Sequence, residues 1–320
     1  MQIKEELKNS FTSYWSFMAL RTACQLNLFD EVSKGDSTLV ELKDKLNTDY
    51  KSLTILVNAL VELNTLQIID TKLKLQPKGE LLTETNPDSL KQACILWGSE
   101  HLDAWQNLQY TIKTGRPSFE EEFKSPFFDY LKSDKNKLYN YHQAMAEYAV
   151  DDYRNISKLF DFSQYSTITD IGGGLGVLVQ YIQNSLPNKT YHLVELPEVI
   201  DLVENKNNIN LIKADFFKPI PVQSEMIILS RVLHDWDNDK ARLILQNCIE
   251  SLTNNGRILI IEIMQEEISA NLLSLNMMSM CKSHERTFTQ YGNLIEGVGL
   301  KVSNKTKLNS LQTILTIEKQ

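Results

Sequence analysis

The chain has 320 residues, enough for about two domains, and its 42% apolar and 23% charged fractions are those of an ordinary globular protein. With 33 Lys and Arg against 41 Asp and Glu, its net charge of −8 argues against general binding to nucleic-acid backbones. Its apolar runs fall short of the ~18 residues of a membrane span. The start, MQIKEELKNSF, lacks the pattern of a signal peptide, and the four cysteines form no CxxC pair. Composition therefore predicts a cytoplasmic enzyme without disulfides or a cysteine zinc site.

The first 160 residues are patterned as helices. Residues 14–33 carry apolar side chains at helical spacing, and a second helix is expected from Thr38, where Thr38 and Glu41 can form a capping box. Asp49 can cap a third helix over SLTILVNALVELN, and QIIDTKLKLQPKG alternates like a hairpin. Three helices and a hairpin are the order of a winged helix, so the pattern alone leaves a DNA-binding interpretation open.

After residue 160, short apolar runs alternate with amphipathic stretches. Further helices are expected before it at 89–115 and 135–160, separated by an aromatic loop over 116–131. Strands are expected at 167–171, 190–194, 209–212, 226–230, 257–263, 301–306 and 312–318, and helices at 176–185, 197–205, 239–252, 272–282 and 289–297. The pattern predicts a doubly wound α/β domain that binds its ligand at the carboxyl ends of the central strands.

A glycine-rich turn follows the first strand of this half. Asp170 precedes Gly172, Gly174 and Gly176, and glycines there allow a tight turn and a close approach of ligand to backbone. The spacing is G-x-G-x-G, not the G-x-G-x-x-G of dinucleotide enzymes, because position 177 is valine. Led by an acid, the turn suits a cofactor with a cationic amino-acid end better than a pyrophosphate.

Acidic residues end the next two strands. Glu195 lies 19 residues past Gly176, where a carboxylate can accept hydrogen bonds from ribose hydroxyls. Asp215 can accept one from an adenine amino group, beside the apolar Phe216. Turn glycines with solvated acids are the alternative, but three such elements in order at successive strand ends favour a nucleotide site.

These motifs resemble those of the S-adenosylmethionine-dependent O-methyltransferases of the plant caffeic-acid and bacterial acetylserotonin type. DIGGGLG resembles the family's glycine motif, VELPEVI its ribose motif and ADFF its adenine motif. SRVLHDWDND resembles the segment with the catalytic histidine, and HERT the later glutamate segment. ALRTACQLNLFD, STLVELKDKLN and TGRPSFEEEF in the amino-terminal half are also similar, so the resemblance covers nearly the whole chain.

The resemblance implies a Rossmann-like class I methyltransferase sheet, mostly parallel with an antiparallel last strand, and an all-helical, winged-helix-like dimerisation domain before it. The implied division is a dimerisation domain over 1–95, a helical connector lining the acceptor pocket over 96–160, and a catalytic domain over 161–320. It also implies a homodimer whose early helices swap between subunits. Together with the acidic net charge, the resemblance favours a role in dimerisation over DNA binding for the winged-helix-like domain. No nucleic-acid or membrane partner is expected.

The resemblance further implies S-adenosylmethionine as cofactor, S-adenosylhomocysteine as product, and no metal. It implies His234 as general base, flanked by Glu262 and Glu285, and a neutral imidazole suits removal of a phenolic proton. The implied cofactor-binding residues are Asp170, Gly172, Gly174, Gly176, Glu195, Leu196, Asp215, Phe216, Ser230, Arg231 and Trp236. The implied acceptor-binding residues are His142, Met145, Asp235, Met277 and Met278.

Core packing is an equally good explanation of Trp236, and a better one for methionine at helical spacing. Two positions depart from the family pattern. Glu195 stands where aspartate is usual, and Lys282-Ser283, beside His284, replace a small glycine pair, which could narrow or recharge the pocket mouth.

The predicted function is methyl transfer to a phenolic or enolic hydroxyl of a small aromatic compound, as in secondary metabolism. Two alternatives remain. Some family members keep the cofactor but catalyse pericyclic, decarboxylation or hydroxylation reactions, and these tend to alter the base or its glutamates. A winged-helix regulator that senses the cofactor would want a basic recognition helix, whereas YKSLTILVNALVELN has one lysine and no arginine.

Overall fold

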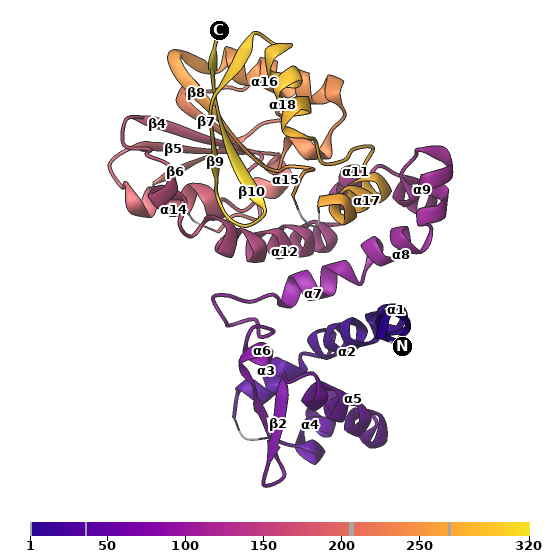
Figure 1. The fold of residues 1–320 in the computed structure, drawn as a ribbon. Helices are drawn as coiled ribbons and strands as arrows, with labels where there is room; N and C mark the ends of the chain where they lie inside the picture. Colours follow the sequence, from indigo (N-terminus) through magenta and orange to yellow (C-terminus); the bar gives the residue numbers. More distant parts are fainter. Residues whose placement is uncertain (1, 36, 205–207, 268–269) are drawn as a thin grey trace. The chain divides into compact units, whose positions relative to one another are not determined.

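The computed structural model describes residues 2–35, 37–204, 208–267 and 270–320 (Figure 1). The chain divides into two compact units, Met1–Glu100 and His101–Gln320, each with hydrophobic cores of its own. No helix in the described ranges is both long and apolar enough to cross a membrane. None of the four cysteines, all of them described, is in a disulfide.

The first unit combines helices with a small sheet. Its helices are α1 (Gln2–Thr12), α2 (Tyr14–Gln25), α3 (Leu28–Ser33), α4 (Leu39–Leu46), α5 (Tyr50–Glu62), α6 (Pro77–Glu80) and α7 (Lys91–Trp97). Strands β1 (Ser37–Thr38), β2 (Leu66–Ile69) and β3 (Lys72–Leu75) pair antiparallel in the order β1-β3-β2. The predicted hairpin is therefore confirmed as β2 and β3.

The helix starts of this unit follow their capping residues. Thr38 and Glu41 form the predicted capping box at α4, and the Asp49 carboxylate accepts the N–H of Ser52 at 2.8 Å at α5. The single helix predicted over 14–33 is wrong. The chain breaks between α2 and α3 at Asn27, which has a left-handed φ of 56°, a conformation that asparagine tolerates better than most residues.

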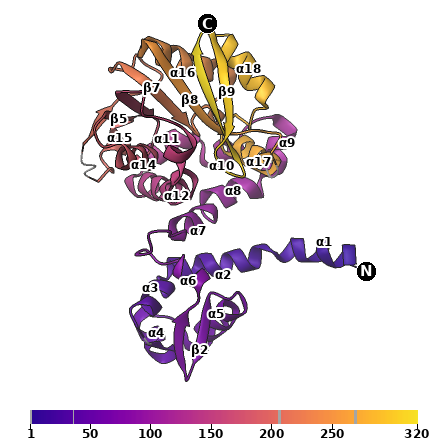
Figure 2. The same cartoon turned by 60° about the vertical axis from the view of Figure 1, so that its left-hand side comes forward.

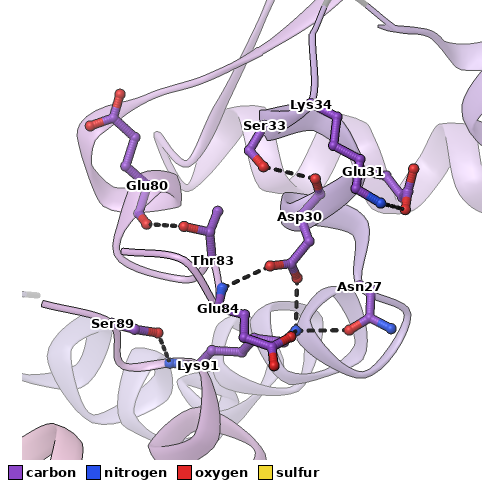
Figure 3. Close-up of polar contacts among 10 residues, drawn as sticks. All are labelled: Asn27, Asp30, Glu31, Ser33, Lys34, Glu80, Thr83, Glu84, Ser89 and Lys91. Atoms are coloured by element: carbon purple, nitrogen blue, oxygen red, sulfur yellow. Dashed lines mark hydrogen bonds and ion pairs between the residues drawn. The ribbon is translucent and has the colours of Figure 1, made fainter. Parts of the chain in front are cut away.

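A buried lysine ties α3 to the segment before α7. Lys91 is 3% exposed, and its Nζ lies 2.8 Å from both Asn27 Oδ1 and Asp30 Oδ2 (Figure 3). The other carboxylate oxygen of Asp30 accepts the N–H of Glu84 at 2.7 Å. Because a buried charge persists only when it is paired and hydrogen-bonded, this cluster fixes the 84–91 segment against α3.

A seven-stranded sheet forms the centre of the second unit. Its strands are β4 (Thr167–Ile171), β5 (Thr190–Glu195), β6 (Ile209–Lys213), β7 (Ser224–Ser230), β8 (Leu252–Ile263), β9 (Leu300–Lys307) and β10 (Gln312–Lys319). The order is β6-β5-β4-β7-β8-β10-β9, with β10 antiparallel to both neighbours and the pairs from β6 to β8 parallel. The mostly parallel sheet is thus confirmed, and its strand order reverses between β4 and β7, where such sheets bind ligands.

The helices of this unit begin with α8 (Glu100–Gln106), whose first residue belongs to the first unit. They continue with α9 (Leu108–Thr114), α10 (Ser118–Phe123), α11 (Phe127–Lys132), α12 (Lys135–Tyr153), α13 (Ile156–Leu159), α14 (Val177–Ser185), α15 (Pro197–Ile200), α16 (Asn238–Glu250), α17 (Ala270–Met280), α18 (Phe288–Glu296) and the 3₁₀ turn η1 (Leu233–Asp235). Apolar residues of α16 and α18 pack on one face of the sheet and those of α12, α13 and α14 on the other (Figure 1).

Further predicted segments also differ from the structure: the stretch 89–115 forms α7, α8 and α9, and the stretch 135–160 forms α12 and α13. The aromatic loop expected over 116–131 is wrong, because α10 and α11 form there, each directly after a proline (Pro117 and Pro126) whose fixed φ suits a helix start. The helix expected over 197–205 is only the four-residue α15, and residue 205 lies outside the described ranges.

Candidate functional site

His234 lies at the carboxyl edge of the sheet, in η1, shortly after β7 ends. The ring is buried, and its Nδ1 lies 2.8 Å from Oε1 of Glu285, a residue between α17 and α18 that is fully buried. The other ring nitrogen, Nε2, lies 3.6 Å from Oδ1 of Asp235. A neutral His234 that donates from Nδ1 to the Glu285 carboxylate therefore keeps the lone pair of Nε2 free to accept a proton.

Glu262 supports the backbone of the same turn. It is fully buried near the end of β8, and its Oε1 accepts the N–H groups of Leu233 at 3.0 Å and of His234 at 3.3 Å. Burying a carboxylate costs free energy of desolvation, so a fully buried glutamate indicates a structural or chemical role. The structure thus brings the three predicted catalytic residues together.

Two further side chains hold the turn from its carbonyl side. Arg286 is 4% exposed, and its guanidinium donates to the carbonyl oxygens of Leu233 at 2.7 Å and Trp236 at 2.6 Å. The Ser283 hydroxyl donates to the carbonyl oxygen of His234 and lies 3.3 Å from that of Trp236. From the sequence, Arg286 has no predicted role, and Ser283 is predicted at the pocket mouth.

The charges around His234 set its proton affinity. Burial alone would disfavour the imidazolium, but the carboxylates of Glu285, Asp235 and Glu262 outweigh it and raise the His234 pKa to about 9. Burial works against ionisation of Glu285 too, yet the cations of His234, Arg231 and Arg286 hold its pKa below the ordinary value. The free protein therefore favours a protonated His234 ring paired with Glu285 at neutral pH, and this ring must release its Nε2 proton before Nε2 can act as a base.

Arg231 occupies an unusual backbone position next to this pair. Its φ is 55°, in the left-handed region that side-chain-bearing residues rarely adopt, and it follows directly after β7. Its charge interacts with Glu285 and Glu262. Its buried Nε has no hydrogen-bond partner within the described part of the chain, so the guanidinium has a donor to spare.

The glycine turn after β4 has the backbone that the sequence predicted. Gly172, Gly174 and Gly176 all have positive φ, between 56° and 75°, and Gly176 caps α14. A Cβ at Gly172 would lie 2.8 Å from the Val232 side chain, so the turn packs directly against the segment that leads to His234. Only glycine fits there, because both the conformation and the space exclude a side chain.

Two buried acids face this turn in different states. Glu195 accepts the N–H of Gly174 at 3.2 Å and of Leu196 at 2.8 Å, so both of its oxygens are hydrogen-bonded. Neither oxygen of Asp170 makes a hydrogen bond of ordinary geometry among the described residues, although this side chain is 1% exposed, and the backbone N–H of Val179 only partly offsets the rise in its pKa. Burial raises the pKa of both to about 7, helped for Asp170 by the nearby charge of Glu195.

Aromatic rings gather beside Trp236. Its ring stacks on that of Phe128 in α11 at a centroid distance of 5.5 Å, and meets Phe217 edge-on at 4.8 Å and Phe216 at 6.2 Å. Asp215 accepts the N–H of Phe217 at 3.0 Å and lies near the surface. Trp236 and Phe216 thus form one apolar cluster, with Asp215 at its edge.

Ser230, at the end of β7, contacts α12. Its hydroxyl lies 2.6 Å from the phenolic oxygen of Tyr153, a buried residue that no sequence motif indicates. On the same helix, the Nδ1 of His142 would lie 3.3 Å from a Cβ at Gly174, so this histidine faces the glycine turn. Burial lowers the His142 pKa to about 4 and keeps the ring neutral.

The remaining predicted acceptor residues lie on two helices. Met145 is on α12, one turn after His142, and is half-buried, while α17 carries the buried Met277 and the half-buried Met278. On α17, Ser274 also accepts the N–H of Glu285 at 3.3 Å. Hydrogen bonds such as this one and those of Ser283, Arg286 and Tyr153 join residues far apart in sequence, so no local motif reveals them.

Known proteins resemble this chain over most of its length. Residues 105–301 match the model of an O-methyltransferase domain, and residues 9–78 that of an O-methyltransferase dimerisation domain, which indicates a homodimer. The phenazine O-methyltransferase PhzM of Lysobacter antibioticus is 27% identical over 305 residues, covering 92% of this chain and 89% of that protein. The crystal structure of LaPhzM has a TM-score of 0.95 at 25% identity, covering 99% of each chain.

A hydroxylase is also among the relatives. The aclacinomycin 10-hydroxylase RdmB of Streptomyces purpurascens is 28% identical over 306 residues, covering 90% of this chain and 82% of that protein. The family model spans more than half of the chain and the dimerisation model most of its first unit. The chain therefore belongs to the O-methyltransferase family, a class of enzymes that use S-adenosylmethionine.

Proposed function

We propose that the enzyme methylates a hydroxyl group of a small aromatic compound, with His234 as the general base. The observation that carries the proposal is the 2.8 Å contact between His234 Nδ1 and the buried Glu285 carboxylate, which leaves Nε2 for the acceptor. Nε2 takes the hydroxyl proton, Glu285 keeps the ring oriented and stabilises its positive charge, and Glu262 holds the backbone under the ring. Alignment of the attacking oxygen supplies much of the remaining rate.

S-adenosylmethionine supplies an electrophilic methyl group when bound. The glycine turn fits such a ligand, because the buried Asp170 carboxylate makes no hydrogen bond of ordinary geometry among the described residues and the glycines leave room against the backbone. Asp170 would hold the cationic amino-acid end and Glu195 the ribose hydroxyls. The adenine would lie by Leu196, Asp215, Phe216 and Trp236, with Gly172, Gly174, Gly176, Ser230 and Arg231 completing the site.

An aromatic acceptor is supported by the apolar residues and by the relatives. Met145, Met277 and Met278 lie on α12 and α17, and we assign them, with His142 and Asp235, to the acceptor side. PhzM is named for a phenazine, a fused aromatic compound. Because Asp235 Oδ1 lies 3.6 Å from His234 Nε2, an acceptor hydroxyl bound at Nε2 would also contact the Asp235 carboxyl group.

The early helices are assigned to the dimer. The apolar side chains Ile3, Leu7, Phe11, Tyr14 and Trp15 are 57–81% exposed, and their spacing places them along one face of α1 and α2. Figure 2 shows α1 continuing α2 away from the rest of its unit. A second subunit whose helices swap with these would cover the exposed stripe. We assign residues 1–95 to a winged-helix-like dimerisation domain that makes this contact. We further assign residues 96–160 to the helical connector and residues 161–320 to the catalytic domain. We also propose that the enzyme works in the reducing cytoplasm.

Methyl transfer from labelled S-adenosylmethionine tests the proposal. The panel is hydroxyphenazines, catechols, naphthols, quinolones and polyketide phenols, and His234→Ala is compared with the wild type for turnover and for binding of S-adenosylhomocysteine. Turnover is expected to fall by about 10²–10⁴-fold with binding retained. Wild-type turnover in His234→Ala would refute the base assignment. If the cofactor binds but no panel member is ever methylated, the proposal fails in favour of chemistry like that of the hydroxylase relative.

A further inference from the structure

We propose that Ser283 is a positioning residue that fixes the turn carrying His234, an inference that rests on the base role proposed above. Ser283 is 6% exposed and lies in the short segment between α17 and Glu285. Its hydroxyl donates to the carbonyl oxygen of His234 itself and is within 3.3 Å of that of Trp236. The side chain thus faces the backbone of the turn.

The turn is held on two sides, and Ser283 completes the second. Glu262 receives the N–H groups of Leu233 and His234. On the carbonyl side, Arg286 holds Leu233 and Trp236, which leaves the carbonyl of His234 to Ser283. Without that hydroxyl, the peptide that follows the base can rotate while its neighbours stay fixed.

The place of Ser283 in the chain links the base to its acid. Ser283 is two residues before Glu285, so one short segment supplies both the bond to the His234 backbone and the bond to its ring. Movement of this segment would change both contacts together. Because a misplacement of about 1 Å can cost about 10²-fold in rate, a hydrogen bond at this point affects turnover beyond its effect on stability.

Ser283→Gly removes the hydroxyl and leaves no side chain at this position. Ser283→Ala removes the same hydroxyl with less change in backbone freedom. Ser283→Thr keeps the hydroxyl and serves as the rescue variant.

A second buried serine provides the matched control. Ser251 is 2% exposed, and its hydroxyl donates to the carbonyl oxygen of Ile220 at 3.1 Å. It precedes the residue that pairs with Ser224 at the start of β7, the end of the strand opposite to His234. Ser251→Ala therefore loses the same kind of hydrogen bond, with a comparable fall in Tm, far from the base.

The test follows the ring of His234 by NMR in protein carrying ¹³C-labelled histidine, saturated with S-adenosylhomocysteine, the signal being assigned by its loss in His234→Gln. We expect Ser283→Ala and Ser283→Gly to lower the titration midpoint of His234 by about half a unit or more, because the bond to Glu285 is held less well. Ser283→Thr restores the midpoint, and Ser251→Ala leaves it unchanged. With an acceptor from the panel, kcat falls about 10-fold and KM stays within about 2-fold.

An unchanged midpoint in both Ser283→Ala and Ser283→Gly, or an equal shift in Ser251→Ala, would overturn the inference. The NMR measurement needs no acceptor, so it stands apart from the test of the function. Failure of the base assignment would appear instead as wild-type turnover in His234→Gln.

Discussion

The turn that carries His234 and the glycine turn after β4 lie in contact, but Asp170 beside the glycine turn is bonded differently from the acids of the first turn. Glu285 and Glu262 each have one oxygen bonded within the turn of the base, to a ring nitrogen and to backbone N–H groups. Asp170, equally buried, has neither oxygen bonded among the described residues. Bonds within the chain organise the turn of the base, whereas the glycine turn retains one buried carboxyl group, that of Asp170, without a hydrogen bond.

This difference indicates which part of the chemistry the fold supplies. The base and its acid are positioned before any ligand arrives, which is how an enzyme avoids reorganisation during the reaction. In the free protein, burial of the Asp170 carboxylate costs free energy, and pairing with a cationic ligand would offset that cost. Buried acids with raised pKa values are typical of functional sites. The two turns can therefore be distinguished experimentally, since one should govern turnover and the other affinity.

Glu285→Gln should have the largest effect. The substitution removes the negative charge that stabilises the imidazolium, so the His234 pKa falls from about 9 toward its ordinary value. The pH above which turnover levels off therefore shifts to lower pH, while the plateau rate falls about 10²–10³-fold, because the ring loses its orienting partner. Profiles of kcat against pH measure both effects.

The matched control for this charge change is Glu250→Gln, an exposed residue at the end of α16. It should leave the profile of the wild type intact. A Glu285→Gln enzyme with an unshifted profile would mean that the group titrating in turnover is not His234.

Asp170→Asn should change affinity instead. Loss of a charge-assisted contact weakens binding of S-adenosylhomocysteine by about 10–100-fold, while the free protein keeps or gains stability because a buried charge is removed. Calorimetric titration gives the affinity and thermal unfolding the Tm. Asp239→Asn, whose side chain is 96% exposed, is the control. A large fall in the Tm of the free Asp170→Asn protein would show that Asp170 has an internal partner.

The affinity for cofactor should also depend on pH. Asp170 and Glu195 have pKa values raised to about 7, so both lose charge as pH falls through 7, and binding of S-adenosylhomocysteine should be about 10-fold weaker at pH 6 than at pH 8. In the free protein, stability from these raised carboxyl groups is present at low pH and is lost as pH rises from about 4 through about 7. The rise in Tm on binding should therefore be larger at pH 8. Equal affinities at both pH values would contradict the raised pKa values.

Some features of the fold and of the two turns leave local patterns in the sequence, and others do not. The strands were predictable from their short apolar runs, and the glycine turn from residues that permit a positive φ. The acids were predictable because they directly follow predicted strands. The break at Asn27 depends on one residue's tolerance of a left-handed φ, and it was missed. Ser283 and Arg286 contact carbonyl groups some 50 residues away in sequence, and such bonds have no local pattern.

Removal of metal ions should have the smallest effect on the turn of the base. His234, Glu262 and Glu285 place ligand atoms within 4.8 Å of one another, a spacing that could hold a cation. However, His234 Nδ1 and Glu285 are already bonded to each other, and Glu262 accepts two backbone N–H groups. A cation would have to displace the contacts that organise the base.

Turnover after dialysis against EDTA should therefore equal that of untreated enzyme, and added Zn²⁺ should inhibit by competing with the proton for His234. Binding of S-adenosylhomocysteine should be unaffected by either treatment, since the glycine turn offers Asp170 to a cationic ligand at a separate point. If EDTA abolished turnover and Mg²⁺ restored it, the contacts within this turn would instead be the resting state of a metal site. The contrast between a turn completed by the chain and one completed by its ligand would then fail.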